Sequence, residues 1–171
     1  MTMPSSTGFL RLAFDGFHQA RARLGECLSA HGASADAVAI PAAETIYWGC
    51  VLDEQLTSDG GYKTVRGRAI VDVMRGARWI RNRSTHALPL TVERTGGLSL
   101  PIQVPITIEP VVVCWLRADR LPPEPPKYVD AAGRIAYDKN FADRPVSDPV
   151  EDLAQWFANE HGRPGSRLLG T

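Results

Sequence analysis

Residues 64–86 read TVRGRAIVDVMRGARWIRNRSTH, and this stretch carries the clearest structural pattern in the chain. Apolar side chains recur in it at three- and four-residue spacing, which is the period of one helix face. The residues of this apolar stripe are Ile70, Val73, Met74, Ala77 and Ile80. We therefore predict a helix from about Thr64 to His86, ended before Pro89, whose ring cannot continue a helix.

The same stretch is strongly basic. The seven basic residues at positions 63 to 83 are Lys63, Arg66, Arg68, Arg75, Arg78, Arg81 and Arg83, and Asp72 is the one acid, so this basic window carries a charge of +6. The whole chain has 19 basic and 19 acidic residues, which leaves 12 bases and 18 acids elsewhere. A concentrated basic helix on a neutral protein is typical of a surface that binds a polyanion. A solvated helix face paired with acids from other elements is the alternative.

Two further helices are expected before the basic one. Residues 9–30 carry apolar side chains at helical spacing and end at a glycine suited to a C-terminal stop. Residues 41–56 follow, with Pro41 in the first turn, where proline is favoured. This second helix is apolar on nearly all sides of its middle, so we expect it to be central. Residues 58–61, Ser-Asp-Gly-Gly, predict a turn.

The pattern changes after the basic helix. Apolar residues alternate with others over residues 98–108, which is the period of a strand, and Thr95-Gly96-Gly97 predicts a turn before them. Residues 111–116 predict a short buried strand. The four prolines within residues 121–126 predict a linker.

Two short helices are expected in the last quarter of the chain. One covers residues 131–142. The other starts near Asp148, where Asp-Pro-Val-Glu resembles a capping box.

The predicted fold class is mainly α: a helical bundle with a small β-hairpin or extended insertion at about residues 88–117 and a C-terminal helix. One domain accounts for all 171 residues. Its helical core would comprise about residues 9–88 and 131–160. The β-rich insertion and proline-rich linker would occupy about residues 89–130, and residues 162–171 would form a loose tail.

The cysteines and the hydropathy of the chain bear on three features: a zinc site, secretion and a membrane span. Cys27, Cys50 and Cys114 are far apart in sequence, which predicts reduced core thiols rather than a zinc site. No signal-peptide pattern precedes the first helix, and no uncharged apolar run is as long as a membrane span. We therefore expect a cytoplasmic protein that does not enter a membrane. We expect neither a metal nor a cofactor, because the sequence has no HExxH motif and no glycine-rich phosphate loop.

The residues that carry chemistry are Arg81-Asn82-Arg83-Ser84-Thr85-His86, at the end of the basic helix. Cleaving RNA without a metal needs a base for the 2′-hydroxyl proton, a cation for the charge on the phosphorane, and an acid for the departing 5′-oxygen. Histidine can be the base or the acid, because an unperturbed imidazole has a pKa of about 6.5. Arginine matches phosphate oxygens with its planar fork. Asn82 and His86 are neighbours on a helix surface, where the amide could orient the imidazole.

A helical wheel adds a constraint on how these groups can act together. Arg75, Trp79, Asn82 and His86 fall on one side of the helix, whereas Arg81 lies about 140° around from His86. One chain also supplies a single motif histidine. A two-fold dimer with two such helices face to face would place two histidines and two arginines around one phosphate, so the sequence favours a homodimer.

The Arg-Asn-x-x-x-His pattern at Arg81–His86, preceded by two helices, resembles the signature of the HEPN superfamily of helical nucleic-acid-processing proteins. The resemblance covers roughly residues 9–88 and the helix near 149–160. It implies a small helical bundle, a dimer with the motif at its interface, and metal-independent endoribonuclease activity, often in toxins or defence proteins. Carried over to this chain, Arg81 would bind phosphate, Asn82 would be the polar residue beside it, and His86 would be catalytic.

The chain departs from that family pattern in two places. Leu88 stands where a subgroup of HEPN toxins has the tyrosine that an antitoxin modifies, so this form of control is not expected here. Residues 89–130 have no counterpart in a minimal bundle. They could cover the dimer groove, extend the interface or bind a protein partner.

The remaining site residues are assigned by their position on the basic helix. We expect Arg75, Arg78 and Arg83 to hold the RNA backbone. Trp79 could stack on a base, or could pack in the core or at an interface. Glu44 is expected to pair with an arginine of the basic helix in a structural role.

Two other functions remain open on the sequence. The first is a non-catalytic dimeric module that binds RNA or a protein with the same helix. The second is a nucleotide-sensing module whose Arg81 and His86 bind a free phosphate ligand. The expected partners are RNA and a second copy of the chain, and the resemblance to toxins adds a protein partner or antitoxin.

Overall fold

The computed structural model describes residues 6–30, 32–58, 60–87, 91–97 and 109–169. Its long helices are α1 (Ser6–Ser29), α2 (Ala35–Thr57), α4 (Arg68–Ala87) and α6 (Ser147–His161), and its shorter elements are α3 (Gly60–Val65), β1 (Val92–Gly97), β2 (Glu109–Trp115) and α5 (Ala131–Asn140). Two short 3-10 turns, Ala118–Arg120 and Pro126–Tyr128, lie between β2 and α5. The predicted fold class is confirmed: the protein is mainly α, with a small antiparallel hairpin.

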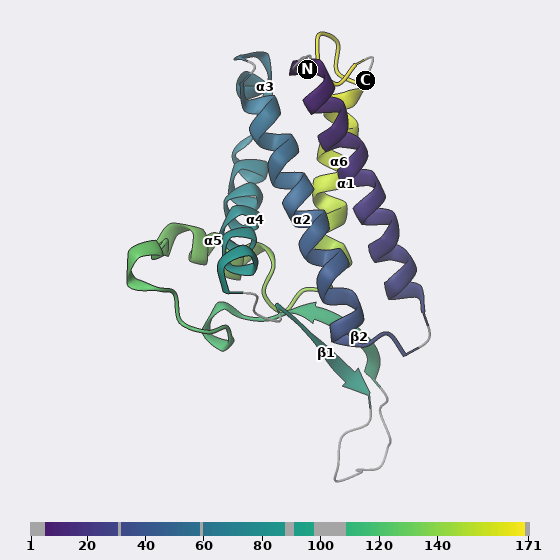
Figure 1. The fold of residues 1–171 in the computed structure, drawn as a ribbon, viewed down its shortest axis with the longest axis vertical. Coiled ribbons are helices and arrows are strands. Elements are labelled where there is room, and N and C mark those ends of the chain that lie inside the picture. The colour runs from purple at the N-terminus through teal and green to yellow at the C-terminus, as the bar shows by residue number, and fades with distance from the viewer. Residues whose placement is uncertain (1–5, 31, 59, 88–90, 98–108, 170–171) are drawn as a thin grey trace, which may run out of the picture.

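The four long helices lie side by side, and the hairpin lies across one end of them (Figure 1). Helix α2 contacts α1, α3, α4, α6 and β1, as its nearly continuous apolar surface predicts. Helix α1 buries one stripe of side chains at three- and four-residue spacing: Leu10, Ala13, Phe17, Ala20 and Leu24. Phe17 meets Phe157 of α6 edge to face, with ring centroids 5.2 Å apart, which closes the bundle from the α1 side.

Helix α5 packs against the outer side of α4. The Trp79 ring lies 4.8 Å from that of Tyr137, centroid to centroid. The backbones come closest at Gly76, where a Cβ atom would lie 3.0 Å from the Ala136 carbonyl oxygen and from the Tyr137 nitrogen. Glycine is therefore needed at position 76 so that the two helices can approach this closely.

The hairpin is fastened to the bundle through β2. Strands β1 and β2 pair antiparallel, with Val92 opposite Trp115. The other edge of β2 bonds to the segment before α6. The Trp115 amide donates to the Arg144 carbonyl at 3.0 Å, and the Val146 amide donates to the Val113 carbonyl at 2.9 Å. Trp115 is buried, so the hairpin shares the core of the helices.

The predicted bounds of two helices were wrong. Helix α2 starts at Ala35 because the Ser34 hydroxyl accepts from the Ala37 amide at 3.2 Å and caps the helix, so Pro41 lies inside it and not in its first turn. The basic stretch is two helices, α3 and α4, rather than one. Helix α3 ends where the Arg66 amide donates to the Tyr62 carbonyl at 3.0 Å. Gly60 and Gly61 are the first residues of α3, so they are helical and not in the predicted turn.

Two other predictions were wrong for the described residues. Thr95-Gly96-Gly97 is part of β1, where Gly96 takes a positive φ of 86° and the pairing register shifts. The predicted loose tail is packed: Leu168 is buried, and Arg167 donates to the Ser58 hydroxyl at 2.6 Å. The alternating segment 98–108 lies outside the described residues.

We predict that Gly76→Ala destabilises the protein by about 1–3 kcal/mol, because the new methyl group meets the α5 backbone and forces α4 and α5 apart. This loss exceeds the roughly 1 kcal/mol that alanine gains over glycine in a helix. Urea and thermal unfolding followed by circular dichroism measure the change. Gly25→Ala is the matched control, since nothing lies within 4 Å of its added Cβ atom and the substitution should stabilise α1. Equal stabilisation by both substitutions would contradict the close approach.

Candidate functional site

The motif predicted from the sequence lies in the last two turns of α4, where this helix passes α2. Arg81 and Asn82 are at the surface, and the backbone of His86 is in the final turn of the helix. The His86 side chain lies outside the described part of the chain. The geometry of the site therefore comes from Arg81, Asn82 and the α2 residues that face them.

The Arg81 guanidinium is held from two sides. Its Nη1 donates to the Glu54 carboxylate at 2.7 Å, and its Nε and Nη2 donate to the Asn82 amide oxygen at 3.3 and 3.2 Å. The side chain retains 21 % of its exposure. Nη1 and Nη2 each carry a second N–H that no described residue accepts, so the guanidinium can still bind an anion. Asn82 thus directs its amide oxygen at Arg81, whereas the sequence suggested His86.

An open depression of about 370 Å³ lies beside Arg81, between α2 and α4. Its lining residues are Ala43, Glu44, Tyr47, Trp48, Arg81, Ser84 and Thr85. The Thr85 hydroxyl donates to the Arg81 carbonyl at 2.9 Å and is therefore turned back onto the helix. The depression combines two aromatic side chains of α2 with the cation of α4, and bases and phosphates are the ligands that suit these two kinds of group.

Glu44 borders this depression but does not pair as predicted. Its carboxylate accepts from Arg23 of α1, with Nη2 to Oε2 at 2.8 Å, and not from an arginine of α4. Both partners are largely exposed, so this ion pair adds little to stability. The sequence could not identify the partner, because Arg23 and the arginines of α4 are equally plausible for a carboxylate on α2.

A buried acid lies behind Arg81. Asp53 of α2 is fully buried, and its Oδ2 accepts from Arg78 and, at 3.2 Å, from Arg66. Its Oδ1 accepts from the Tyr62 hydroxyl at 2.6 Å, and that hydroxyl accepts in turn from Trp156 Nε1 at 3.0 Å. Burial, and then the Asp53 charge, raise the pKa of Tyr62, so the hydroxyl stays protonated and can donate.

Cys50 of α2 is near Arg78 and Arg81, but burial raises the pKa of its thiol to about 12. The thiol is therefore protonated at neutral pH and is not a nucleophile. Among the residues that the structure describes, no three His, Cys, Asp or Glu side chains gather closely enough to hold a metal ion. No helix of that part of the chain is both long enough and apolar enough to cross a bilayer.

Three of the predicted RNA-binding side chains have other partners. Trp79 is 4 % exposed and packs on Tyr137, so it cannot stack on a base. Arg83 is buried over the Trp79 ring and donates to the carbonyls of Pro122 and Pro123. Arg78 is bound to Asp53. Helix α5 and the proline-rich segment cover Trp79 and Arg83, on a face of α4 that looks polar in sequence, whereas Asp53 of α2 holds Arg78.

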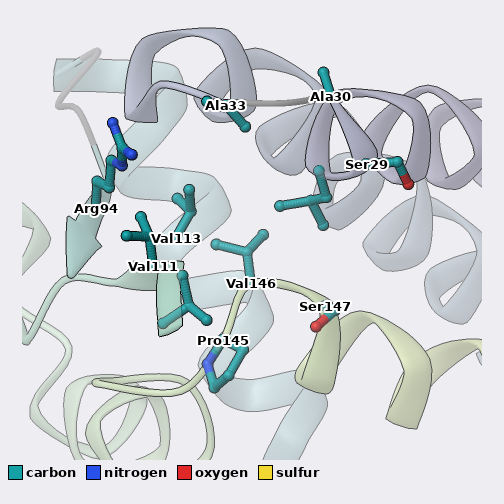
Figure 2. Close-up of a pocket in the computed structure, with 12 residues that line it drawn as sticks. Ser29, Ala30, Ala33, Arg94, Val111, Val113, Pro145, Val146 and Ser147 are labelled. Carbon is teal, nitrogen blue, oxygen red and sulfur yellow. The ribbon is translucent and has the colours of Figure 1, made fainter. Parts of the chain in front are cut away.

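A second cavity, of about 350 Å³, lies between the end of α1, the hairpin and the start of α6 (Figure 2). Most of its lining side chains are apolar, with Val111, Val113, Pro145 and Val146 on one side and Ala30 and Ala33 on the other. Arg94 is its only charged lining residue among those that the structure describes. This cavity shares no lining residue with the depression beside Arg81.

Comparisons with protein-family models, with curated proteins and with solved structures each find no match. The residues around the candidate site that sequence reasoning missed are Glu54, which orients Arg81, and the buried group of Asp53, Arg66 and Tyr62. Glu54 lies one residue after Asp53 near the end of α2. This acidic pair was the signal in the sequence that could have indicated partners for the arginines of the basic helix.

We predict that Tyr62→Phe lowers the free energy of unfolding by about 1.5–3 kcal/mol, because the buried carboxylate loses a hydrogen bond and Trp156 Nε1 loses its acceptor. Urea denaturation of both proteins measures this difference. Tyr47→Phe is the control, since Tyr47 is half exposed and its hydroxyl bonds to no described residue; it should change stability by less than about 0.5 kcal/mol. Indistinguishable effects of the two substitutions would mean that the Asp53 group does not stabilise the fold.

Proposed function

We propose that the protein is a metal-independent endoribonuclease of the HEPN type, active as a homodimer. One observation carries the proposal: Arg81, five residues before His86 on the same helix, presents a guanidinium with two free N–H groups beside an open depression. A cation fixed in this way is ready to receive a phosphodiester. The resemblance of Arg81–His86 to the HEPN signature supports the assignment of the histidine.

The reaction would be a transesterification. The 2′-oxygen of the ribose attacks the adjacent phosphorus, the bond from phosphorus to the 5′-oxygen breaks, and the products are a 2′,3′-cyclic phosphate and a free 5′-hydroxyl. His86 would accept the 2′-hydroxyl proton or deliver a proton to the 5′-oxygen. Arg81 would stabilise the negative charge that develops on the phosphorane oxygens, and Glu54 and Asn82 would keep its guanidinium in place.

A second copy of the chain would supply the second histidine, which gives one base and one acid around one phosphate. The outer face of α2 beside the depression supports this arrangement, because Ile40 is 70 % exposed and Tyr47 is 47 % exposed there. Exposed apolar side chains that gather next to a site are typical of a surface that a partner covers. A cytoplasmic toxin or defence protein, controlled by an antitoxin or another protein partner, is the biological setting that the resemblance suggests.

We predict that the purified protein cleaves single-stranded RNA or tRNA in the presence of EDTA, and that His86→Ala abolishes cleavage while the fold and the oligomeric state are kept. Gel analysis of labelled RNA, with detection of 2′,3′-cyclic phosphate ends, measures the activity. His18→Gln is the matched control, since it removes an imidazole from α1, where His18 packs against Phe14 and Phe17, and it should leave cleavage unchanged.

Undiminished cleavage by His86→Ala would contradict the proposed mechanism. Intact RNA with both proteins, folded and dimeric, would instead favour the non-catalytic binding module. A thermal shift with mononucleotides and none with oligonucleotides would favour the nucleotide-sensing module.

We also predict that Tyr47→Glu converts the dimer to a monomer and suppresses cleavage, because a charge would be placed in an apolar interface. Light scattering coupled to size-exclusion chromatography measures the mass without RNA. Ile135→Glu is the control, since Ile135 is 70 % exposed on α5, on the other side of α4, and its substitution should leave the dimer intact. A dimer that persists in Tyr47→Glu would exclude this face of α2 as the interface.

A further inference from the structure

The structure divides the basic window of residues 63–83 into bound and available cations. Four of its members have polar partners. Arg66 and Arg78 bind Asp53, Arg81 binds Glu54, and Arg83 binds the backbone carbonyls of Pro122 and Pro123. The other three members are Lys63, Arg68 and Arg75, and none of them has a carboxylate of a described residue within 4 Å.

Two of the available cations lie on the same side of α4 as Asn82 of the motif. Arg68, Arg75 and Asn82 follow one another at intervals of seven residues and all are exposed. Seven residues make nearly two helical turns, so these side chains leave the helix on one side, about 10.5 Å apart along its axis. The stripe therefore leads from the start of α4 to Asn82, which contacts Arg81.

A cavity of about 520 Å³ lies on this stripe, between the first half of α4 and α5. Its lining residues are Arg68, Ala69, Val71, Asp72, Arg75 and Lys139. Asp72 is its only acid among the described residues, and it accepts from Lys139 Nζ at 2.6 Å and from Asn140 Nδ2 at 3.4 Å. Three cations and one acid give the cavity a charge of +2. Two guanidinium groups that have no carboxylate of a described residue within 4 Å, over a concave surface, are a preferred arrangement for a phosphate group.

We propose that the cavity of Arg68, Arg75 and Lys139 is a phosphate-binding subsite that holds the backbone of a single-stranded RNA, several nucleotides away from the phosphodiester at Arg81. This inference rests on the proposed ribonuclease function and adds the course of the substrate along α4. RNA is favoured over a free nucleotide because the stripe continues from the cavity to the motif, and only a strand with several phosphates can reach both. The subsite also replaces Arg78 and Arg83, which are bound internally, as the contact to the RNA backbone.

The test compares Arg68→Gln/Arg75→Gln with a control that has the same change of charge, Arg11→Gln/Arg134→Gln. Arg11 and Arg134 are exposed, on α1 and α5, and neither lines the cavity. Binding of a fluorescent 20-nucleotide single-stranded RNA is measured by anisotropy over a series of salt concentrations, with His86→Ala added to every variant so that the RNA stays intact. Cleavage of a dinucleoside monophosphate is measured separately with His86 present, because its one phosphate can occupy only the site at Arg81.

We expect the cavity variant to bind the 20-nucleotide RNA roughly tenfold or more weakly than the control variant. The slope of log K against log salt should fall by about 1.4, since each lost single-strand phosphate contact removes about 0.7. Cleavage of the dinucleoside monophosphate should be unchanged.

Equal RNA affinity and equal salt slope in the two double variants would overturn the subsite and leave the proposed function standing. A parent protein that binds no RNA at any salt concentration would overturn both. If the parent protein binds nucleoside triphosphates but not RNA, and only the cavity variant loses this binding, the cavity binds a free nucleotide. That result would overturn its assignment to RNA.

Discussion

The buried carboxylate of Asp53 is the interaction on which the arrangement of the helices depends. Both of its oxygens are bonded: one accepts from Tyr62 of α3, and the other accepts from Arg78 of α4 and from Arg66 between these helices. Tyr62 extends the group to α6 by accepting from Trp156. An unpaired charge in this position would cost several kcal/mol, so α3, α4 and α6 must meet α2 at one point along its length. The end of α2 thus sets the position of α4, and with it the position of the motif.

The same carboxylate explains why the charge of the basic window overstates the number of cations that are available to a ligand. Arg78 and Arg66 neutralise Asp53, and Arg83 is covered by the proline-rich segment, so three of the seven cations in the window are structural. What remains for a ligand is Lys63 and the outer stripe of Arg68 and Arg75, together with the partly exposed Arg81. The interpretation as a face paired with acids from other elements therefore applies to Arg66, Arg78 and Arg81, and the polyanion interpretation stays a proposal for Arg68 and Arg75.

The sequence predicted what local rules determine. The mainly α class, the central position of α2 and the strand over residues 111–116 follow from hydrophobic period and turn residues, and the structure confirms them. It could not predict partners far apart in the chain. Trp79 and Arg83 look like surface residues until α5 and the proline-rich segment are placed against α4, and nothing local to Arg66 shows that it binds Asp53. The start of α2 was missed for a different reason, because a capping serine outweighed the preference of proline for a first turn.

The two acids at the end of α2 have different consequences for the cations they hold. Asp53 is buried, so Arg78 cannot leave it without removing one of the two cations that balance a charge away from water. Glu54 is 47 % exposed, and an ion pair in water contributes only about 0–1 kcal/mol, so a phosphate can take its place on Arg81 at little cost. Arg78 Nε lies 3.9 Å from the same Glu54 oxygen and would still balance the charge of a displaced carboxylate. Of the three arginines that bind this acidic pair, Arg81 is therefore the one that can exchange its partner for a ligand, and it is also the one that belongs to the Arg-Asn-x-x-x-His motif.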